Sequence, residues 1–264
     1  MIFGRLAEDL HADRPVALAT RLDGPQTGAK LLVTFDDAAG DLGSDGLNAA
    51  VAAEARALLM SGETAIRSFG EDGEPVGVDV RVFIAAYAPK PAMYVFGAID
   101  FSRAVARLGK YLGYTVTVVD ARPVFATKAR IPDADAVVVA WPDTWLAQAP
   151  VDARTALIVL THDVKFDIPL LQVALGTPAG YIGVMGSRRT HANRIAALTD
   201  AGASAADLGR ISAPIGLDIG ARTPEETAIS IAAEIIALRE GRGGGRLSEG
   251  TLPVHNARST VLGR

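Results

Sequence analysis

The chain has 264 residues, of which 49% are hydrophobic and 21% are charged, and its formal net charge is −4. This balance is that of an ordinary globular protein, and it lacks the basic excess that binding to nucleic acid or to an anionic membrane would call for. The absence of cysteine excludes disulfides, thiolate metal ligands and a thiol nucleophile from this chain.

The N-terminal region, residues 1–88, is predicted to form a small α+β domain. Its first ten residues carry acids within the apolar pattern, unlike a signal peptide. No apolar run in the chain reaches the length of about 18 residues that suggests a membrane span, so we expect a cytoplasmic protein without one. The residue patterns predict helices at 2–11 and 47–60, and strands at 15–21, 30–35, 64–69 and 78–87.

A short, stiff linker follows, because Pro89 and Pro91 each fix φ and remove a backbone donor. Residues 92–240 then alternate between helical patterns and apolar runs, which are typical of parallel strands buried on both faces. Strands are expected at 93–96, 115–119, 136–140, 156–160 and 181–184, and helices at 101–112, 165–175, 191–201 and 224–239. The alternation predicts an α/β fold with a Rossmann-like, mostly parallel sheet.

The last helix of this region has a clear start. Thr223 is a suitable N-cap, Pro224 occupies the first helical position and Glu226 completes a T-x-x-E capping box. The glycine- and arginine-rich residues 241–264 that follow cannot bury much surface. We therefore expect a tail that is mobile or wrapped on a partner subunit.

The segment from residue 93 to 120 is the most informative of the chain. It has the order strand, glycine turn, helix, strand and acid of a dinucleotide-binding unit, with Asp120 lying 23 residues after Gly97. The glycine pattern G-x-G-x-x-G is incomplete, because Ile99 and Ser102 occupy its second and third glycine positions. The unit therefore supports the fold strongly and binding of NAD only weakly.

Polar residues gather where the following strands end, which is the edge at which ligands collect in open α/β sheets. Glycine and serine before a helix offer backbone N–H groups and a hydroxyl, and arginines add charged donors, so together they suit a phosphate. We expect that phosphate to face Asp120 and Thr161 across a crevice. The residues concerned are Thr161, His162 and Asp163, then Gly186, Ser187, Arg188 and Arg189, and later Gly216 and Asp218.

Several of these residues have a structural alternative that stays open. For Arg188 and Arg189 it is a solvated turn, and for His162 it is a hydrogen-bonded structural histidine. For Asp218 the alternative is closure of a turn, and for Asp120 it is capping of the turn that follows.

The same residues do not add up to a catalytic or metal site. His162, Asp163 and His191 are too sparse to predict a metal. Ser187 lacks a G-x-S-x-G turn and an evident base, so it is not expected to be a nucleophile.

Several segments resemble the C-terminal, Rossmann-like domain of the XdhC/CoxI family. They are residues 181–189, 211–221 and 223–234, together with the Thr-His-Asp motif at 161–163. The N-terminal part, including residues 28–33, resembles the first domain of that family more loosely. Members of the family are accessory factors of xanthine dehydrogenase and aerobic carbon monoxide dehydrogenase.

The resemblance implies a dimeric accessory protein rather than an enzyme. Such a protein would bind molybdenum cofactor, as molybdopterin or its cytidine dinucleotide form, protect it, support its sulfuration and deliver it to a molybdenum hydroxylase apoenzyme. Its partners would be that apoenzyme, a cysteine desulfurase and a second copy of the chain. On this interpretation the cofactor-binding residues are Gly97, Asp100, Asp120, Thr161, His162, Asp163, Gly186, Ser187, Arg188, Arg189, Gly216 and Asp218.

The chain departs from the family pattern at two places. It has Ile99 and Asp100 where the family usually has glycine and histidine, and it lacks the cysteine that the family often has in its first domain. Two alternative functions stay open. One is an NAD(P)-dependent oxidoreductase that would use Asp120 for the ribose and Arg122 for a 2′-phosphate, and the other is a scaffold that only contacts the dehydrogenase.

Overall fold

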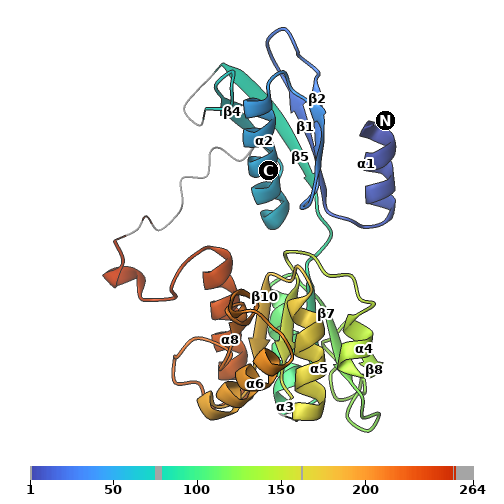
Figure 1. The fold of residues 1–264 in the computed structure, drawn as a ribbon, viewed down its shortest axis with the longest axis vertical. Coiled ribbons are helices and arrows are strands. Elements are labelled where there is room, and N and C mark those ends of the chain that lie inside the picture. The colour runs from blue at the N-terminus through green and yellow to red at the C-terminus, as the bar shows by residue number, and fades with distance from the viewer. Residues whose placement is uncertain (1, 75–78, 162, 252, 254–264) are drawn as a thin grey trace. The chain divides into compact units, whose positions relative to one another are not determined.

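The computed structural model describes residues 2–74, 79–161, 163–251 and 253, and it divides the chain into two compact units (Figure 1). The first unit comprises the residues up to Pro89 together with the described C-terminal residues Thr251 and Pro253, and the second runs from Lys90 to Gly250. Each unit has its own sheet and its own hydrophobic core.

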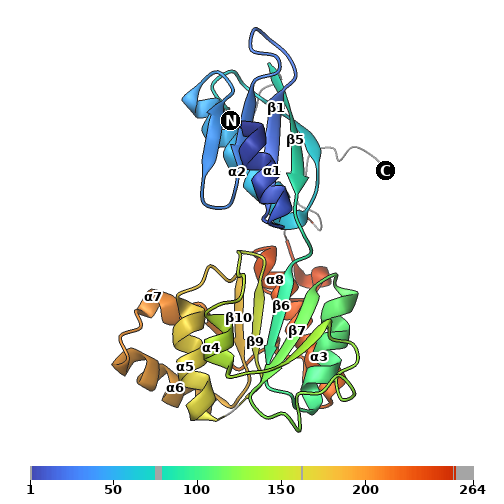
Figure 2. The ribbon, with the colours of Figure 1, turned by 90° about the vertical axis from the view of Figure 1, so that its right-hand side faces the viewer.

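The N-terminal unit is built on a five-stranded antiparallel sheet in the order β3-β2-β1-β5-β4. Helix α2 (Asp45–Ser61) buries one of its sides against the sheet, and helix α1 (Ile2–His11) lies on the opposite face (Figures 1 and 2). The Ser44 hydroxyl caps α2 by accepting a 3.2 Å hydrogen bond from the Leu47 amide. The strands are β1 (Val16–Arg21), β2 (Lys30–Val33), β3 (Ala38–Asp41), β4 (Ala65–Phe69) and β5 (Val80–Tyr87).

The second unit is an α/β domain with a six-stranded sheet in the order β11-β10-β9-β6-β7-β8, in which every pairing is parallel. Counted from β6, this is the 3-2-1-4-5-6 order of the dinucleotide-binding fold. The predicted Rossmann-like parallel sheet is therefore confirmed. The strands are β6 (Ala92–Phe96), β7 (Thr115–Asp120), β8 (Ala136–Val139), β9 (Ala156–Val159), β10 (Tyr181–Val184) and β11 (Ile211–Ser212).

Helices cover both faces of this sheet. On one face α3 (Asp100–Tyr111) and α8 (Pro224–Arg239) pack against a core that includes Met93 and Val95. On the other face lie α4 (Pro142–Leu146), α5 (Val164–Leu175) and α6 (Arg188–Asp200), over a core that includes Tyr94 and Phe96. Alternate residues of β6 thus enter opposite cores, which is why its sequence shows no polar alternation.

Four short elements were not predicted. They are β3, α4, α7 (Ala205–Leu208) and β11, which have between two and five residues and lack the continuous apolar run that marks the equally short strand β9. Helix α6 begins at Arg188 rather than at the predicted residue 191. The Ser187 hydroxyl starts it by accepting a 3.1 Å hydrogen bond from the Thr190 amide.

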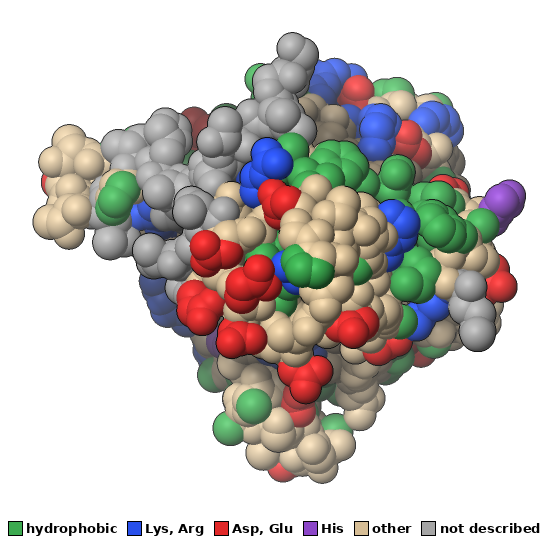
Figure 3. Space-filling view, turned by 90° about the horizontal axis from the view of Figure 1, so that it is seen from above, with side chains coloured by type: hydrophobic (Ala, Val, Ile, Leu, Met, Phe, Trp, Pro, Cys, Tyr) green, Lys and Arg blue, Asp and Glu red, His purple; other side chains and the backbone are tan. Residues whose placement is uncertain are grey.

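The C-terminal segment has one short element, the 3-10 helix η1 (Leu247–Glu249). The remainder of the predicted tail, residues 252 and 254–264, lies outside the described residues, so its mobility stays a prediction. Among the described residues, none of the helices combines the length and hydropathy needed to cross a bilayer. On the face shown in Figure 3, acidic side chains gather over one part of the surface and apolar side chains over another.

Candidate functional site

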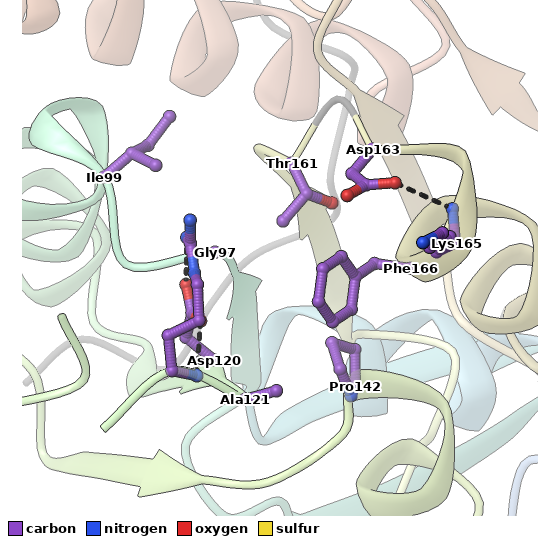
Figure 4. Close-up of a pocket in the computed structure, with 10 residues that line it drawn as sticks. Gly97, Ile99, Asp120, Ala121, Pro142, Thr161, Asp163, Lys165 and Phe166 are labelled. Carbon is purple, nitrogen blue, oxygen red and sulfur yellow. Dashed lines mark hydrogen bonds and ion pairs between the residues drawn. The ribbon is translucent and has the colours of Figure 1, made fainter. Parts of the chain in front are cut away.

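A crevice opens at the C-terminal ends of the parallel strands in the second unit, with a volume of about 610 Å³ (Figure 4). Strands β6 and β9 are neighbours in the centre of the sheet, and the chain leaves them in opposite directions along it. This is the topological switch point at which open α/β sheets bind ligands. The crevice is lined by Gly97, Ile99, Asp120, Ala121, Arg122, Pro142, Thr161, Asp163, Lys165 and Phe166.

Gly97 allows the two central strand ends to approach each other. Its φ is +105°, and a Cβ atom built on it would lie 2.8 Å from Cγ2 of Thr161 and 3.2 Å from the Thr161 nitrogen. Glycine is therefore required here both by the backbone conformation and by the lack of space. The contact forms the floor of the crevice between β6 and β9.

The Asp120 carboxylate is saturated by hydrogen bonds from the protein itself. One oxygen accepts from the Ala98 amide at 2.7 Å and from Nη2 of Arg122 at 2.7 Å. The other accepts from Nε and from the amide of Arg122, each at 2.9 Å. Burial by itself would raise the pKa of Asp120, but the Arg122 and Ala98 hydrogen bonds outweigh it and lower that pKa.

The glycine turn has further internal hydrogen bonds. The amide of Ile99 donates to Oγ of Ser102 at 3.0 Å, and the Ala98 amide is the one already bound to Asp120. Two N–H groups that could point at a diphosphate are therefore taken. Asp100, at the first position of α3, is exposed, and its carboxylate lies 3.8 Å from Arg130. It lines a separate groove between α3 and α8 rather than the crevice.

The start of α5 forms the opposite wall. Asp163 caps this helix, because one of its carboxylate oxygens accepts a 3.0 Å hydrogen bond from the Lys165 amide (Figure 4). The Phe166 ring stacks on Trp141, with 5.1 Å between ring centroids and 29° between ring planes.

The pKa of Arg122 is raised, chiefly by its hydrogen bonds to Asp120, and the charge of Asp163 adds to the shift.

A buried ion pair holds this wall from behind. The side chains of Arg194 and Asp167 are 2% and 1% exposed. Nε and Nη2 of Arg194 donate hydrogen bonds of 2.9 Å and 2.5 Å to the same carboxylate oxygen, Oδ2 of Asp167. The same arginine donates to the backbone oxygens of Met185 and Thr161, and the Thr161 hydroxyl donates to Asp167 at 2.5 Å. This network ties the ends of β9 and β10 to helices α5 and α6.

The predicted phosphate-binding turn at 186–189 lies apart from the crevice lining. Gly186 has a φ of +146°, and a Cβ atom on it would lie 2.9 Å from Nη1 of Arg194, so it makes room for the buried arginine. Ser187 caps α6, while Arg188 and Arg189 are exposed. None of these four residues lines the crevice with Asp120 and Thr161. Anion binding at this turn stays a prediction.

The remaining predicted residues also lie away from the crevice lining. Gly216, with a φ of +96°, donates its amide to Glu234 at 2.9 Å, and a Cβ atom on it would meet Oγ of Ser230 at 2.3 Å. Asp218 is exposed. His162 falls outside the described residues.

Of the residues predicted for the site, the crevice thus brings together Gly97, Asp120, Thr161 and Asp163. Sequence reasoning considered Arg122 only for a 2′-phosphate and missed Lys165 and Phe166. One local signal could have indicated the latter two, because a strand followed by an aspartate N-cap places the next residues in the first turn of a helix. The described residues contain no group of three or more metal-binding side chains.

The comparisons with known proteins agree with this architecture. The model of the XdhC Rossmann domain matches residues 93–235, and that of the XdhC and CoxI family matches residues 9–70. A crystal structure of a xanthine dehydrogenase from Bacillus halodurans matches with a TM-score of 0.54 at 20% identity. The match covers 95% of this chain and 98% of that one, and at this identity it shows the fold alone.

Two curated relatives match over the greater part of this chain. A protein of Bacillus subtilis, named as a probable xanthine dehydrogenase subunit, is 33% identical over 160 residues, which is 61% of this chain and 46% of the relative. The molybdenum cofactor insertion chaperone PaoD of Escherichia coli is 28% identical over 163 residues, which is 62% of this chain and 45% of the relative. In these matches the aligned part spans about half the length of each relative.

Proposed function

The chain belongs to the XdhC and CoxI family, and we propose that it is an accessory factor that binds molybdenum cofactor and delivers it to a molybdenum hydroxylase. The enzyme that receives the cofactor would be of the xanthine dehydrogenase or carbon monoxide dehydrogenase type. The names of the two curated relatives support this proposal, because one refers to a xanthine dehydrogenase and the other to insertion of the cofactor.

The observation that carries the proposal is the crevice at the switch point of the Rossmann-like domain. Its lining combines the polar groups of Arg122, Asp163 and Lys165 with the apolar surfaces of Ile99 and Phe166. A pterin with a phosphate-bearing side chain needs both a flat apolar contact and charged partners, so this donor set fits it. The bound cofactor would supply the molybdenum chemistry to the recipient, while the chain's own residues bind, orient and shield it.

The chain can act as a carrier without turning over a substrate. The crevice lining includes no cysteine or histidine among the described residues, and its buried acid, Asp120, is held by Arg122 and Ala98. Sulfur for the cofactor would therefore come from a partner such as a cysteine desulfurase, and not from a thiol of this chain. A homodimer is the assembly that we propose for delivery.

Purification from a molybdenum-replete host tests the proposal. We expect the protein to carry pterin and molybdenum in equal amounts, measured by mass spectrometry, by fluorescence of the oxidised pterin and by elemental analysis. Material from a host that cannot make the cofactor is the control, and adding the loaded protein to a purified apo-hydroxylase should restore its activity. Recovery of a nicotinamide dinucleotide in place of a pterin would instead support an oxidoreductase.

A further inference from the structure

The hydrogen-bond donors of the crevice that the protein does not itself use indicate where each part of a ligand can bind, and the glycine turn offers few of them. In a dinucleotide-binding unit the glycine turn and the following helix hold a diphosphate. Here the amides of Ala98 and Ile99 are bound to Asp120 and Ser102. Ile99 also adds a side chain and Asp100 a negative charge at the helix start, where an anion would have to sit. This turn is therefore a poor site for a diphosphate.

Two cations of the crevice keep donors that the protein does not use. Arg122 is fixed by Asp120 and lies over the Phe125 ring, 4.6 Å from its centroid, yet no described residue accepts a hydrogen bond from its Nη1. Lys165 is exposed at the opposite wall, and Nζ has neither a hydrogen bond nor an ion pair with the described residues. A guanidinium edge and an ammonium group are both suitable partners for a phosphate monoester.

One acid of the crevice also keeps a free acceptor. Asp163 uses one carboxylate oxygen to cap α5, and the other has no hydrogen bond to the described residues (Figure 4). A carboxylate is the natural partner for adjacent N–H donors, such as the amino group and ring N–H of a 2-amino-4-oxopteridine. Phe166, whose ring lies beside the crevice in Figure 4 and is backed by Trp141, offers an aromatic surface next to that edge.

We propose that the crevice is specific for a 2-amino-4-oxopteridine carrying a single phosphate monoester, with Asp163 bound to the amino edge and Arg122 and Lys165 bound to the phosphate. This inference rests on the proposed function and refines it, because it selects the monophosphate form over a dinucleotide form. The role of Asp120 is then to position Arg122, in place of gripping a ribose. The specificity comes from residues of the β7 end and α5 rather than from the turn at 186–189.

Fluorescence titration of the full chain tests each contact with simple probes. They are hydroxymethylpterin monophosphate, the unphosphorylated alcohol, the diphosphate, and the lumazine monophosphate in which oxygen replaces the 2-amino group. We expect the monophosphate to bind about 10- to 100-fold more tightly than the alcohol and than the lumazine, as expected for hydrogen bonds to charged groups. The second phosphate of the diphosphate should add nothing.

Matched variants assign the contacts. Asp163→Asn keeps the ability to cap α5 but should bring the pterin-to-lumazine affinity ratio close to one. Lys165→Ala should weaken binding of the monophosphate about tenfold and leave binding of the alcohol unchanged. Arg103→Ala, which removes an exposed cation of α3 outside the crevice, is the control and should change neither ratio.

The inference is overturned if Asp163→Asn keeps the unsubstituted protein's ratio, or if Lys165→Ala behaves like Arg103→Ala. It is also overturned if Arg188→Ala alone abolishes the advantage of the phosphate, since that result would place the anion at the turn 186–189. Co-purification of cofactor with the unsubstituted protein is a separate measurement, which tests the proposed function and not the contacts. If cofactor co-purifies but the variants leave the affinity ratios unchanged, the proposed function stands and the contact assignment fails. If no pterin co-purifies and none of the pterin probes binds in the titration, both proposals fail.

Discussion

The guanidinium of Arg122 grips the carboxylate of Asp120 through two hydrogen bonds, of 2.9 Å from Nε and 2.7 Å from Nη2. In dinucleotide-binding folds the acid at this strand end accepts hydrogen bonds from a ribose. Here its acceptor positions are filled by Arg122 and by the Ala98 amide. The acid is thus part of the scaffold that shapes the crevice, and Arg122 lines the crevice beside it.

NAD and NADP should therefore bind weakly or not at all. The ribose partner and two amides of the glycine turn are already satisfied within the protein. We expect no binding by titration calorimetry at ligand concentrations up to about 100 μM, which corresponds to a binding free energy weaker than about −5.5 kcal/mol. Low-micromolar affinity for either dinucleotide would contradict this prediction and favour the oxidoreductase alternative.

Asp120 should stabilise the fold in a pH-dependent manner. Its folded-state pKa is lowered, because hydrogen bonds from Arg122 and Ala98 outweigh the effect of burial. Its contribution is therefore present above the unfolded-state pKa of about 3.9 and is lost as the pH falls through the lower folded-state value. Urea unfolding at about pH 6 and about pH 3 measures the free energy of unfolding at each pH. The decrease from pH 6 to pH 3 should be smaller for Asp120→Asn than for the unsubstituted protein.

The control for this experiment is Asp200→Asn, which changes an exposed acid at the end of α6. Its free energy of unfolding should follow that of the unsubstituted protein at both pH values. Equal pH dependence of all three proteins would show that the Asp120–Arg122 pair makes no net contribution.

The buried pair of Arg194 and Asp167 should be essential for stability. Asp167→Asn would leave a 2% exposed guanidinium without its counter-charge, which should cost about 3–5 kcal/mol. Asp133→Asn breaks a surface pair, in which Arg107 lies 3.3 Å from the carboxylate and the two side chains are 68% and 29% exposed, and should cost less than about 1 kcal/mol. Chemical unfolding of both variants measures the difference, and comparable losses would contradict the role assigned to the buried pair.

Gly97 should tolerate no side chain. Gly97→Ala forces a Cβ atom to within 2.8 Å of Thr161 Cγ2 and strains a φ of +105°, so we expect destabilisation by about 2–4 kcal/mol. Gly113→Ala is the matched control, because its φ is +88° but no atom lies within 4 Å of the added Cβ. It should show the cost of the backbone conformation alone.

The same contact can be tested by a double substitution. Thr161→Ser removes the methyl group that the new Cβ would meet, so Gly97→Ala should cost less in that background. Additive losses in thermal unfolding would show that the two strand ends do not meet as described.

Local sequence patterns determined the elements and the fold class. The apolar runs that became β6, β7, β9 and β10 are buried on both faces, and the T-x-x-E box at Thr223 begins α8 as predicted. Such signals depend on neighbours within a few residues, which is why they can be read without a structure. Elements β3, α4, α7 and β11 were not predicted because they lack a comparable apolar run, and the start of α6 is set by the Ser187 cap rather than by a period.

The composition of the crevice was decided by the tertiary structure. The sheet order sets β6 beside β9, and so brings Gly97 against Thr161, which lies 64 positions further along the chain. The sequence predicted Asp120 at a strand end, but only the folded chain shows that Ala98 and Arg122 fill its hydrogen-bonding positions.

The helix starts decide which further side chains enter the crevice. Ser187 begins α6 at Arg188, and the two arginines are exposed outside the crevice lining, while Lys165 and Phe166 belong to it. Whether a strand-end side chain faces a ligand depends on where the next helix begins and which distant strand lies alongside, and these follow from long-range packing rather than from local pattern.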